Sequence, residues 1–314
     1  MRQLSATLRG VRPFALFLPL FALPVVSGGC DVGLDGKRFD GGSGGATSSS
    51  TSGTGATGGQ GGGGSGAGGG GSGGGVSCTL SDELDDARTL TACWTNAADA
   101  EGGADGFAQL GIDGTGYLVT RPEQGAGFWL NQRGPYLYKE VTGDFAMVSY
   151  ITAHHQADEN LAPTVDYNVG GIVVRSPPTG TETWLKYEIG HVDDGVGVGT
   201  LAGSTVGSVS EHLMPYHYEG LFRGRLALCR VGASVLYFFR PNPEGPWSAE
   251  DLQYTAGAGT AAADFPASVQ AGITVSGYAP ETPDVEAAFD YVRFAVQPMS
   301  GPDACVSALN TLSP

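Results

Sequence analysis

The sequence predicts an all-β protein whose folded part is a sandwich of two antiparallel sheets. Short runs rich in Val, Ile, Tyr and Phe recur from Thr91 onward, and Gly, Pro, Asn and Asp separate them. Several runs are apolar on both faces, as where Phe145 alternates with Ala146 along 143–153, which is typical of central strands covered on both sides. No amphipathic helix is expected, and residues 81–90 are predicted to form at most a short turn.

Seven strands can be placed from these runs. They cover residues 143–153, 170–176, 183–192, 224–231, 234–240, 268–277 and 285–296. Turn signals lie between the predicted elements, at 112–116, 193–195, 231–234 and 241–246. The alternation of runs and turns is what a sandwich of short strands requires.

Three parts of the chain differ in composition. Residues 1–29 are predicted to be a signal peptide, 30–75 a flexible linker, and 76–314 a single β-sandwich domain. Within the linker, residues 41–75 hold 20 Gly among 35 positions and no large apolar side chain. Such a segment buries too little to offset the entropy of ordering, so we expect a disordered tether before the folded domain.

The start of the chain has the features of an export signal. Residues 1–12 hold three arginines and no acid, and residues 13–26 are 14 uncharged, mostly apolar positions. Three small residues then precede Cys30. This pattern resembles a bacterial lipoprotein signal, which implies cleavage before Cys30, acylation of that cysteine and a membrane anchor in the cell envelope. Asp31 leaves the choice of membrane open, and an ordinary secretory signal is the alternative.

The other four cysteines form an even set once Cys30 is taken as the lipid site. Cys78, Cys93, Cys229 and Cys305 are therefore predicted to form disulfides in an exported protein. Three pairings are open. Because the first and last of the four bracket the domain, we favour Cys78–Cys305 together with Cys93–Cys229. No cysteine and histidine spacing fits structural zinc.

The charge of the domain excludes some partners. Residues 76–314 carry 29 acidic and 11 basic side chains, a formal charge of −18. Binding to nucleic acid needs a basic surface that releases counterions from phosphates, so no nucleic-acid partner is expected. The same charge disfavours direct docking to anionic lipid headgroups.

Four blocks of sequence resemble a known family. Residues 127–145, 170–190, 224–240 and 265–294 occur in the order seen in concanavalin A-like jelly-roll sandwiches of the regulation-of-enolase type. Most members of this family have no known function. The resemblance implies a jelly-roll fold of two antiparallel sheets, and it implies no particular activity.

Aromatic residues are the first candidates for a binding site, because sugars stack on exposed rings. Most rings of a sandwich lie in its core, and we expect this for about three in four. The candidate rings are Trp129, Tyr136, Tyr138, Trp184, Tyr187, Tyr216, Tyr218, Trp247 and Tyr278. Within a predicted loop that follows a proline, Tyr216, His217, Tyr218 and Glu219 combine rings with polar groups, so they are the predicted ligand-binding residues.

Metal sites are weighed against simpler interpretations. His154 and His155 lie near Asp158, Glu159 and Asp166, but their spacing fits no ligand pattern, so a solvated loop is favoured and no metal is assigned.

Two further groups are treated in the same way. Asp193 and Asp194 before Gly195 suit calcium, yet an Asp-Gly turn between strands explains them better. His212, His217 and Glu211 have no helix to align them. No cofactor is therefore expected, with calcium as the alternative.

Catalysis on this fold class would need two carboxylates about 5–9.5 Å apart. Glu182 and Glu188 fall on one face of a predicted strand, but six residues separate them by roughly 20 Å. No E-x-D-x-x-E or G-x-S-x-G pattern occurs. The predicted function is non-catalytic binding of carbohydrate or another extracellular polymer. A glycoside-active enzyme with an atypical site and a structural or adhesive envelope protein are the alternatives.

The lipidation of Cys30 can be tested directly. Metabolic labelling with a fatty-acid analogue is expected to mark the wild-type protein and to leave Cys30→Ala unmarked, since the variant lacks the acylated thiol. Label retained in Cys30→Ala would contradict the lipoprotein hypothesis.

Overall fold

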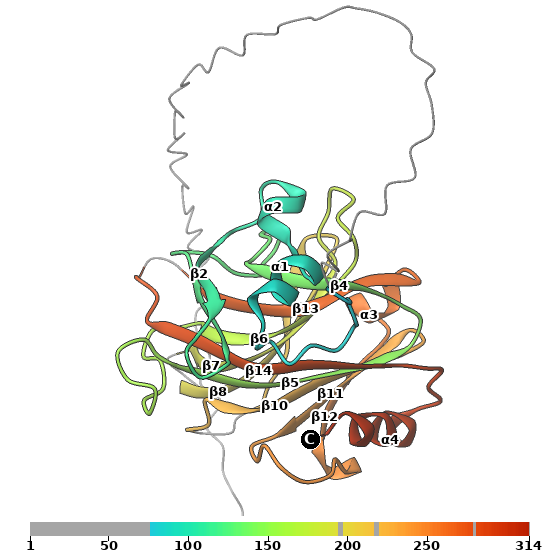
Figure 1. Ribbon diagram of the computed structural model, residues 1–314. Coiled ribbons are helices and arrows are strands. Elements are labelled where there is room, and N and C mark those ends of the chain that lie inside the picture. The colour runs from blue at the N-terminus through green and yellow to red at the C-terminus, as the bar shows by residue number, and fades with distance from the viewer. Residues whose placement is uncertain (1–75, 194–196, 217–219, 279–280, 314) are drawn as a thin grey trace, which may run out of the picture. The chain divides into compact units, whose positions relative to one another are not determined.

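Two antiparallel sheets of seven strands each form the described part of the protein (Figure 1). The first sheet has the order β1 (Thr95–Asn96), β4 (Tyr136–Thr142), β13 (Ser268–Gly277), β6 (Asn168–Arg175), β7 (Trp184–Asp193), β8 (Gly197–Val206) and β9 (Val209–Tyr216). The second has the order β12 (Leu252–Ala256), β11 (Ser234–Arg240), β10 (Arg223–Val231), β5 (Phe145–His155), β14 (Val285–Val296), β3 (Leu118–Pro122) and β2 (Phe107–Ile112). The predicted all-β sandwich of two antiparallel sheets is confirmed.

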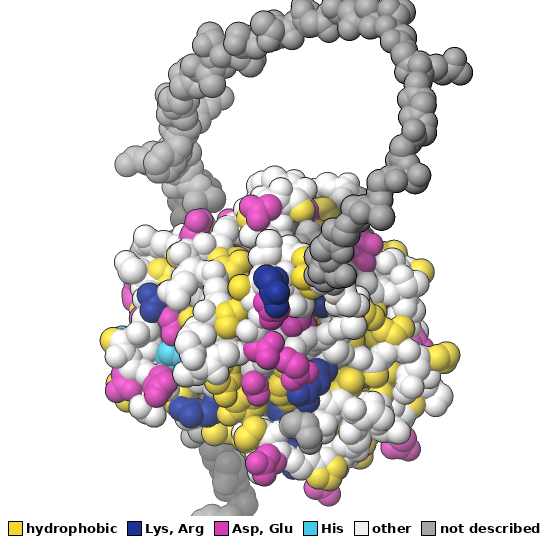
Figure 2. Space-filling model, in the orientation of Figure 1, with side chains coloured by type: hydrophobic (Ala, Val, Ile, Leu, Met, Phe, Trp, Pro, Cys, Tyr) yellow, Lys and Arg dark blue, Asp and Glu magenta, His cyan; other side chains and the backbone are white. Residues whose placement is uncertain are grey.

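This computed structural model describes residues 76–193, 197–216, 220–278 and 281–313. The predictions for the signal peptide, Cys30 and the linker lie outside the described residues. All seven strands predicted from the sequence are present, with ends that differ from the prediction by at most two residues. Figure 2 shows acidic side chains spread over the visible face, as the charge of the domain leads one to expect.

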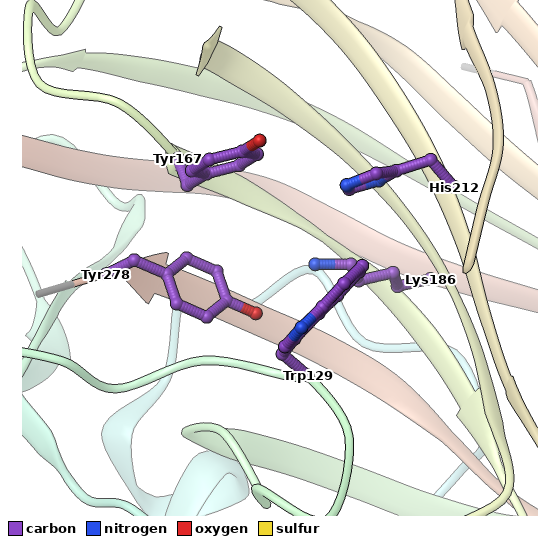
Figure 3. A pocket seen from close by; sticks show the side chains of 5 residues that line it. All are labelled: Trp129, Tyr167, Lys186, His212 and Tyr278. Carbon is purple, nitrogen blue, oxygen red and sulfur yellow. The ribbon is translucent and has the colours of Figure 1, made fainter. Parts of the chain in front are cut away.

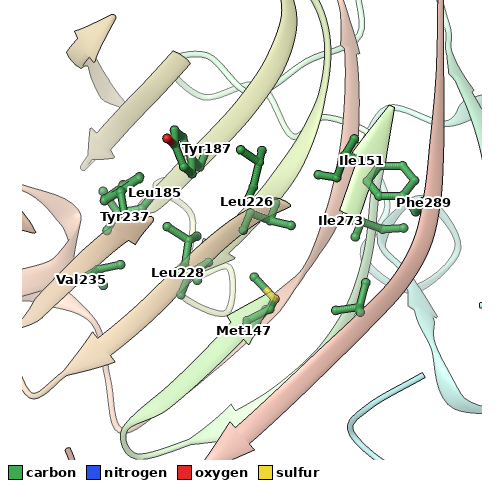
Figure 4. Packing of buried hydrophobic residues seen from close by; sticks show 14 of the residues in the cluster. Met147, Ile151, Leu185, Tyr187, Leu226, Leu228, Val235, Tyr237, Ile273 and Phe289 are labelled. Atoms are coloured by element: carbon green, nitrogen blue, oxygen red, sulfur yellow. The ribbon is translucent and has the colours of Figure 1, made fainter. Parts of the chain in front are cut away.

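Alternation along each strand builds the core between the sheets. On β7 the side chains of Leu185, Tyr187 and Ile189 point inward and are fully buried. They pack against residues of the second sheet such as Leu226 and Tyr237 (Figure 4). The even-numbered residues of β7 therefore face away from this core, on what we call the outer face of the first sheet.

Five helices accompany the strands in the described part of the chain. They are α1 (Ala87–Cys93), α2 (Ala97–Glu101), the 3-10 helix η1 (Ala249–Asp251), α3 (Ala261–Asp264) and α4 (Pro302–Leu312). The expectation of no amphipathic helix was wrong for α4. Its residues Cys305, Ala308 and Leu309 are buried in a second apolar cluster, which covers the outer face of the second sheet. No described helix has the length and apolar character needed to cross a membrane.

Two disulfides form, but not with the favoured pairing. Cys78 bonds to Cys93 and Cys229 bonds to Cys305. The first bond joins the segment before α1 to the end of that helix, and the second joins β10 to α4. The favoured pairing was wrong because α1 brings Cys93 back beside Cys78, with Cα atoms 5.2 Å apart, while α4 packs on the second sheet and places Cys305 beside Cys229.

A third apolar cluster covers much of the outer face of the first sheet. Phe128 packs edge-on against Tyr136 and Trp184 of that face, with ring centroids 5.6 Å apart in both pairs. Ala97, at the start of α2, belongs to the same cluster. Residues 97–106 and 123–135, which we call the covering segment, therefore close this part of the sheet to solvent.

Buried ion pairs hold this covering segment in place. Arg175 of β6 is fully buried, and its guanidinium donates to Glu182 at 2.9 Å and to Glu101 of α2 at 2.8 Å. Arg133, from the covering segment, donates to Glu182 at 2.7 Å. Two arginines and two glutamates balance in charge, which is the condition for burying them together.

Loss of Glu182 is expected to destabilise the fold strongly. Glu182→Gln leaves the buried Arg175 with one carboxylate, and breaking such a buried pair costs about 3–5 kcal/mol. Glu83→Gln is the matched control, because Glu83 pairs with Arg293 but is 54% exposed, and its loss should cost less than about 1 kcal/mol. Urea unfolding measures both, and equal losses would contradict the buried network.

Candidate functional site: an aromatic pocket with a buried lysine

A pocket of about 310 Å³ opens on the outer face of the first sheet, beyond the covering segment. Its lining residues are Trp129, Tyr167, Lys186, His212 and Tyr278. Figure 3 shows three aromatic rings and the imidazole around a space into which Lys186 points its ammonium. The pocket thus combines ring faces with one buried cation.

The floor of the pocket follows from strand register. Lys186 on β7 lies opposite Gly203 on β8, and Gly203 lies opposite His212 on β9. Because the middle member of this row has no side chain, a gap opens between the lysine and the histidine. A Cβ atom on Gly203 would lie 3.0 Å from Lys186 Cε and would narrow that gap.

A buried carboxylate neutralises the lysine. Lys186 Nζ lies 2.8 Å from Glu188 Oε2, and both side chains are at most 1% exposed. Ser276 Oγ donates to the other carboxylate oxygen of Glu188 at 2.8 Å. Gly171 lies opposite Glu188, where a Cβ atom would clash with the Tyr187 carbonyl oxygen and lie 2.6 Å from Glu188 Cγ, so backbone and carboxylate stem together require a glycine.

Tyr278 forms the wall between the pocket and the covered part of the sheet. Its hydroxyl donates to the carbonyl of Phe128 at 2.6 Å, which ties the wall to the covering segment. Burial, followed by the nearby carboxylates of Glu188 and Asp105, raises the pKa of Tyr278 well above its usual value. The phenol therefore stays a neutral donor to Phe128.

Backbone bonds on two sides place Trp129. Ala126, three residues before Trp129, bridges to Gly277 at the end of β13, where the amide of Gly277 donates to the Ala126 carbonyl at 2.8 Å. On the other side, the amide of Leu130 donates to Ser210 Oγ of β9 at 2.5 Å. The indole then stacks on the His212 ring, with centroids 4.8 Å apart.

Tyr167 completes the pocket from the turn before β6. Its backbone is left-handed, with φ of 55°, which is unusual for a residue with a bulky side chain. The ring lies edge-on to Tyr278 at 5.6 Å and parallel to the ring of His212 at 6.1 Å. Burial raises the pKa of Tyr167, so its phenol stays protonated.

His212 is neutral at neutral pH. Packing against its neighbours, and then the positive charge of Lys186, lower the pKa of its imidazole below the usual value. A neutral imidazole has one donor and one acceptor nitrogen. The pocket therefore offers ring faces, an ammonium and an imidazole to a small polar ligand with apolar surfaces.

The predicted aromatic candidates fall into three groups. Five are buried, namely Tyr136, Tyr138, Trp184, Tyr187 and Trp247. Trp129 and Tyr278 are partly exposed and line the pocket. Tyr216 is the last residue of β9, whereas His217, Tyr218 and Glu219 lie outside the described residues, so the assignment of these four to a binding site stays a prediction.

Two pocket residues were absent from the sequence-based candidates. Tyr167 is a single tyrosine in a turn, and nothing local distinguishes it. Lys186 did carry a signal: it stands with Glu188 on one face of an otherwise apolar strand, where a buried lysine needs a partner. The sequence suggests His212 only as a potential metal ligand.

Polar side chains in the predicted turn at 112–116 and in the loop after His155 bond within the protein. Asp113 accepts from the amides of Thr115 and Tyr117, at 2.8 and 3.0 Å, as an aspartate in a turn does. His155 accepts from the amide of Ala157 at 3.1 Å. Among the described residues no three His, Cys, Asp or Glu side chains gather as metal ligands, while Asp194 and Gly195 lie outside them.

Comparison with known proteins gives similarity in fold alone. No family model matches the chain, and no curated protein matches it either, so the enolase-regulation resemblance stays a prediction.

Solved structures with a similar fold include three from Bacillus species. Xylan beta-1,4-xylosidase from Bacillus halodurans has 15% identity and a TM-score of 0.49, over 70% of this chain and 39% of that one. Bacillus licheniformis beta-glucanase has 12% identity and a TM-score of 0.44, over 71% and 100%. Carbohydrate binding module CBM66 from Bacillus subtilis has 14% and 0.40, over 65% and 95%.

Fluorescence provides a test of the pocket geometry. Trp129 is the partly exposed tryptophan, whereas Trp94, Trp184 and Trp247 are each at most 7% exposed. Acrylamide should therefore quench one fraction of the emission, and Trp129→Phe should remove that fraction. Trp247→Phe is the control and should leave it. Quenching that survives Trp129→Phe would contradict the described exposure.

Proposed function

We propose that this protein binds carbohydrate through the aromatic pocket, without catalysis. The observation that carries the proposal is the combination of the partly exposed rings of Trp129 and Tyr167 with the Lys186 ammonium that points between them. A sugar ring presents apolar C–H faces to aromatic rings and hydroxyls to hydrogen-bonding groups, so it matches both kinds of surface.

The hydrogen-bonding capacity of the pocket supports a polyhydroxylated ligand. An ammonium has three donors, and Glu188 is the carboxylate that pairs with Lys186. Lys186 also lines the pocket, so we assign its other donors to ligand oxygens at the pocket floor. The neutral imidazole of His212 adds a donor and an acceptor at the rim, as the hydroxyls of a sugar require.

The state of the carboxylates supports binding rather than glycoside cleavage. Glu188 is held by Lys186 and Ser276, and Glu182 is held by Arg175 and Arg133. A general acid in a glycosidase must be free to hold and release a proton beside the glycosidic oxygen. Carboxylates fixed in buried ion pairs suit a structural role.

The same proposal covers the location of the protein. Two disulfides indicate an extracellular or exported protein. We place the signal peptide at residues 1–29, the acylated cysteine at position 30 and the flexible linker at 30–75, which leaves the β-sandwich of residues 76–314 displayed from a membrane of the cell envelope.

Trp129→Ala is expected to weaken sugar binding by about 2 kcal/mol, or roughly thirtyfold in Kd, because it removes a ring face from the pocket. Tyr117→Ala is the matched control, since Tyr117 is a partly exposed ring in a polar groove of the second sheet. Calorimetric titration of both variants measures the effect, and an equal loss in the two would place the site elsewhere.

A glycan array run with and without calcium supplies the ligand for these titrations. Signal that persists after chelation is expected, since the pocket residues include no set of metal ligands. Absence of signal above background would overturn the proposal in favour of a structural role. Released products from polysaccharide pools would instead indicate an enzyme.

A further inference from the structure

The polar floor of the pocket is electrically balanced. Lys186 Nζ and Glu188 Oε2 are 2.8 Å apart and Lys186 lines the pocket, so the pair forms a floor with no net charge. Carboxylates also act on the rim, because Glu188 and Asp193 both lie close enough to His212 to influence its ionisation. Charge of either sign on a ligand would therefore meet a like charge nearby.

An anionic ligand is disfavoured by these acids. A carboxylate that paired with Lys186 would approach Glu188, and buried like charges repel strongly. The domain as a whole, with a formal charge of −18, adds to this repulsion. A cationic ligand is disfavoured by Lys186 itself, whose ammonium faces the space between the rings.

The shape of the pocket limits the ligand as well. Its volume of about 310 Å³ lies at the lower end of the range for ligand sites. Tyr278, bonded to Phe128, closes it toward the part of the sheet covered by Phe128 and Ala97. A polymer that ran along the sheet would collide with this wall, so the space fits the end of a chain.

We infer that the pocket holds one uncharged sugar unit, at the end of a glycan chain, and that the Lys186–Glu188 pair selects against charged sugars. This inference rests on the proposed function and adds to it the ligand class and the binding mode. Lys186 donates to ligand hydroxyls, and Glu188 keeps the site neutral.

Charge selectivity is tested with matched monosaccharides on the full-length protein. Glucose, galactose, mannose and xylose are titrated beside glucuronate, galacturonate and glucosamine. At least one neutral sugar should bind, and its charged counterpart should bind about tenfold or more weakly. A uronate or amino sugar that binds equally well overturns the inference and leaves carbohydrate binding intact. Failure of every sugar, alone and as oligosaccharides, overturns the proposed function as well.

Glu188→Gln tests the role of the pair. It leaves Lys186 unneutralised at the pocket floor, so the ratio of uronate to neutral-sugar affinity should rise by about tenfold. Ser276→Ala is the control. It removes one hydrogen bond to Glu188 but keeps both charges, so the ratio of uronate to neutral-sugar affinity should stay unchanged. A folded Glu188→Gln protein with the wild-type ratio would contradict the selection. The wild-type titrations decide the point if this variant fails to fold.

End-on binding is tested with a length series of the preferred neutral sugar. The molar affinity should change less than about twofold from the disaccharide to the hexasaccharide, because one unit fills the pocket. For long and short polymers at equal mass, binding should follow the number of chain ends. An affinity that climbs with each added unit would overturn end-on binding and indicate an extended groove.

Discussion

The buried ion pair between Arg175 and Glu182 determines which part of the outer face of the first sheet is covered. Arg175 has no exposed surface, and burial alone would lower the pKa of its guanidinium, but Glu182 and Glu101 outweigh that effect and raise it. Through these carboxylates, α2 and the segment that carries Arg133 are tied to β6. These ion pairs keep Phe128 packed on the outer face of the first sheet. Phe128 and its neighbours therefore cover one part of the outer face, and the pocket opens beside that part.

Small residues opposite charged ones make the second buried pair fit. Lys186 and Glu188 point to the outer face of β7, and each lies opposite a glycine, Gly203 and Gly171 respectively. A Cβ atom at Gly203 would lie 3.0 Å from Lys186 Cε, and a Cβ atom at Gly171 would lie 2.6 Å from Glu188 Cγ. Burial of two ions costs free energy unless their geometry is good, and the two glycines leave the space that this geometry needs. That geometry also aims the ammonium into the pocket before any ligand arrives.

The sequence predicted the fold well because strands are local patterns, and it predicted the site poorly because the pocket is not. Seven of the fourteen described strands were not predicted. One of them, β8, consists mainly of small and polar residues, and such residues are what its place beside Lys186 requires. The helix α4 buries only three side chains, too few for a clear helical period. Pocket residues come from five separate segments between Trp129 and Tyr278, joined only by register and turns. Lys186, a lysine in an otherwise apolar strand, was the one local sign of the pocket in the sequence.

Backbone strain gives a separate reason to regard the pocket as a functional site. Four non-glycine residues among those described have left-handed backbones, and two of them, Leu130 and Tyr167, set the pocket walls. Such conformations cost about 1–3 kcal/mol each and persist where surrounding contacts hold them. Leu130 is held by its bond to Ser210, and the result is the orientation of Trp129. A strand could begin at β6 without a strained tyrosine before it. The strain is therefore best explained by what it does to the two rings, which is to turn them toward Lys186.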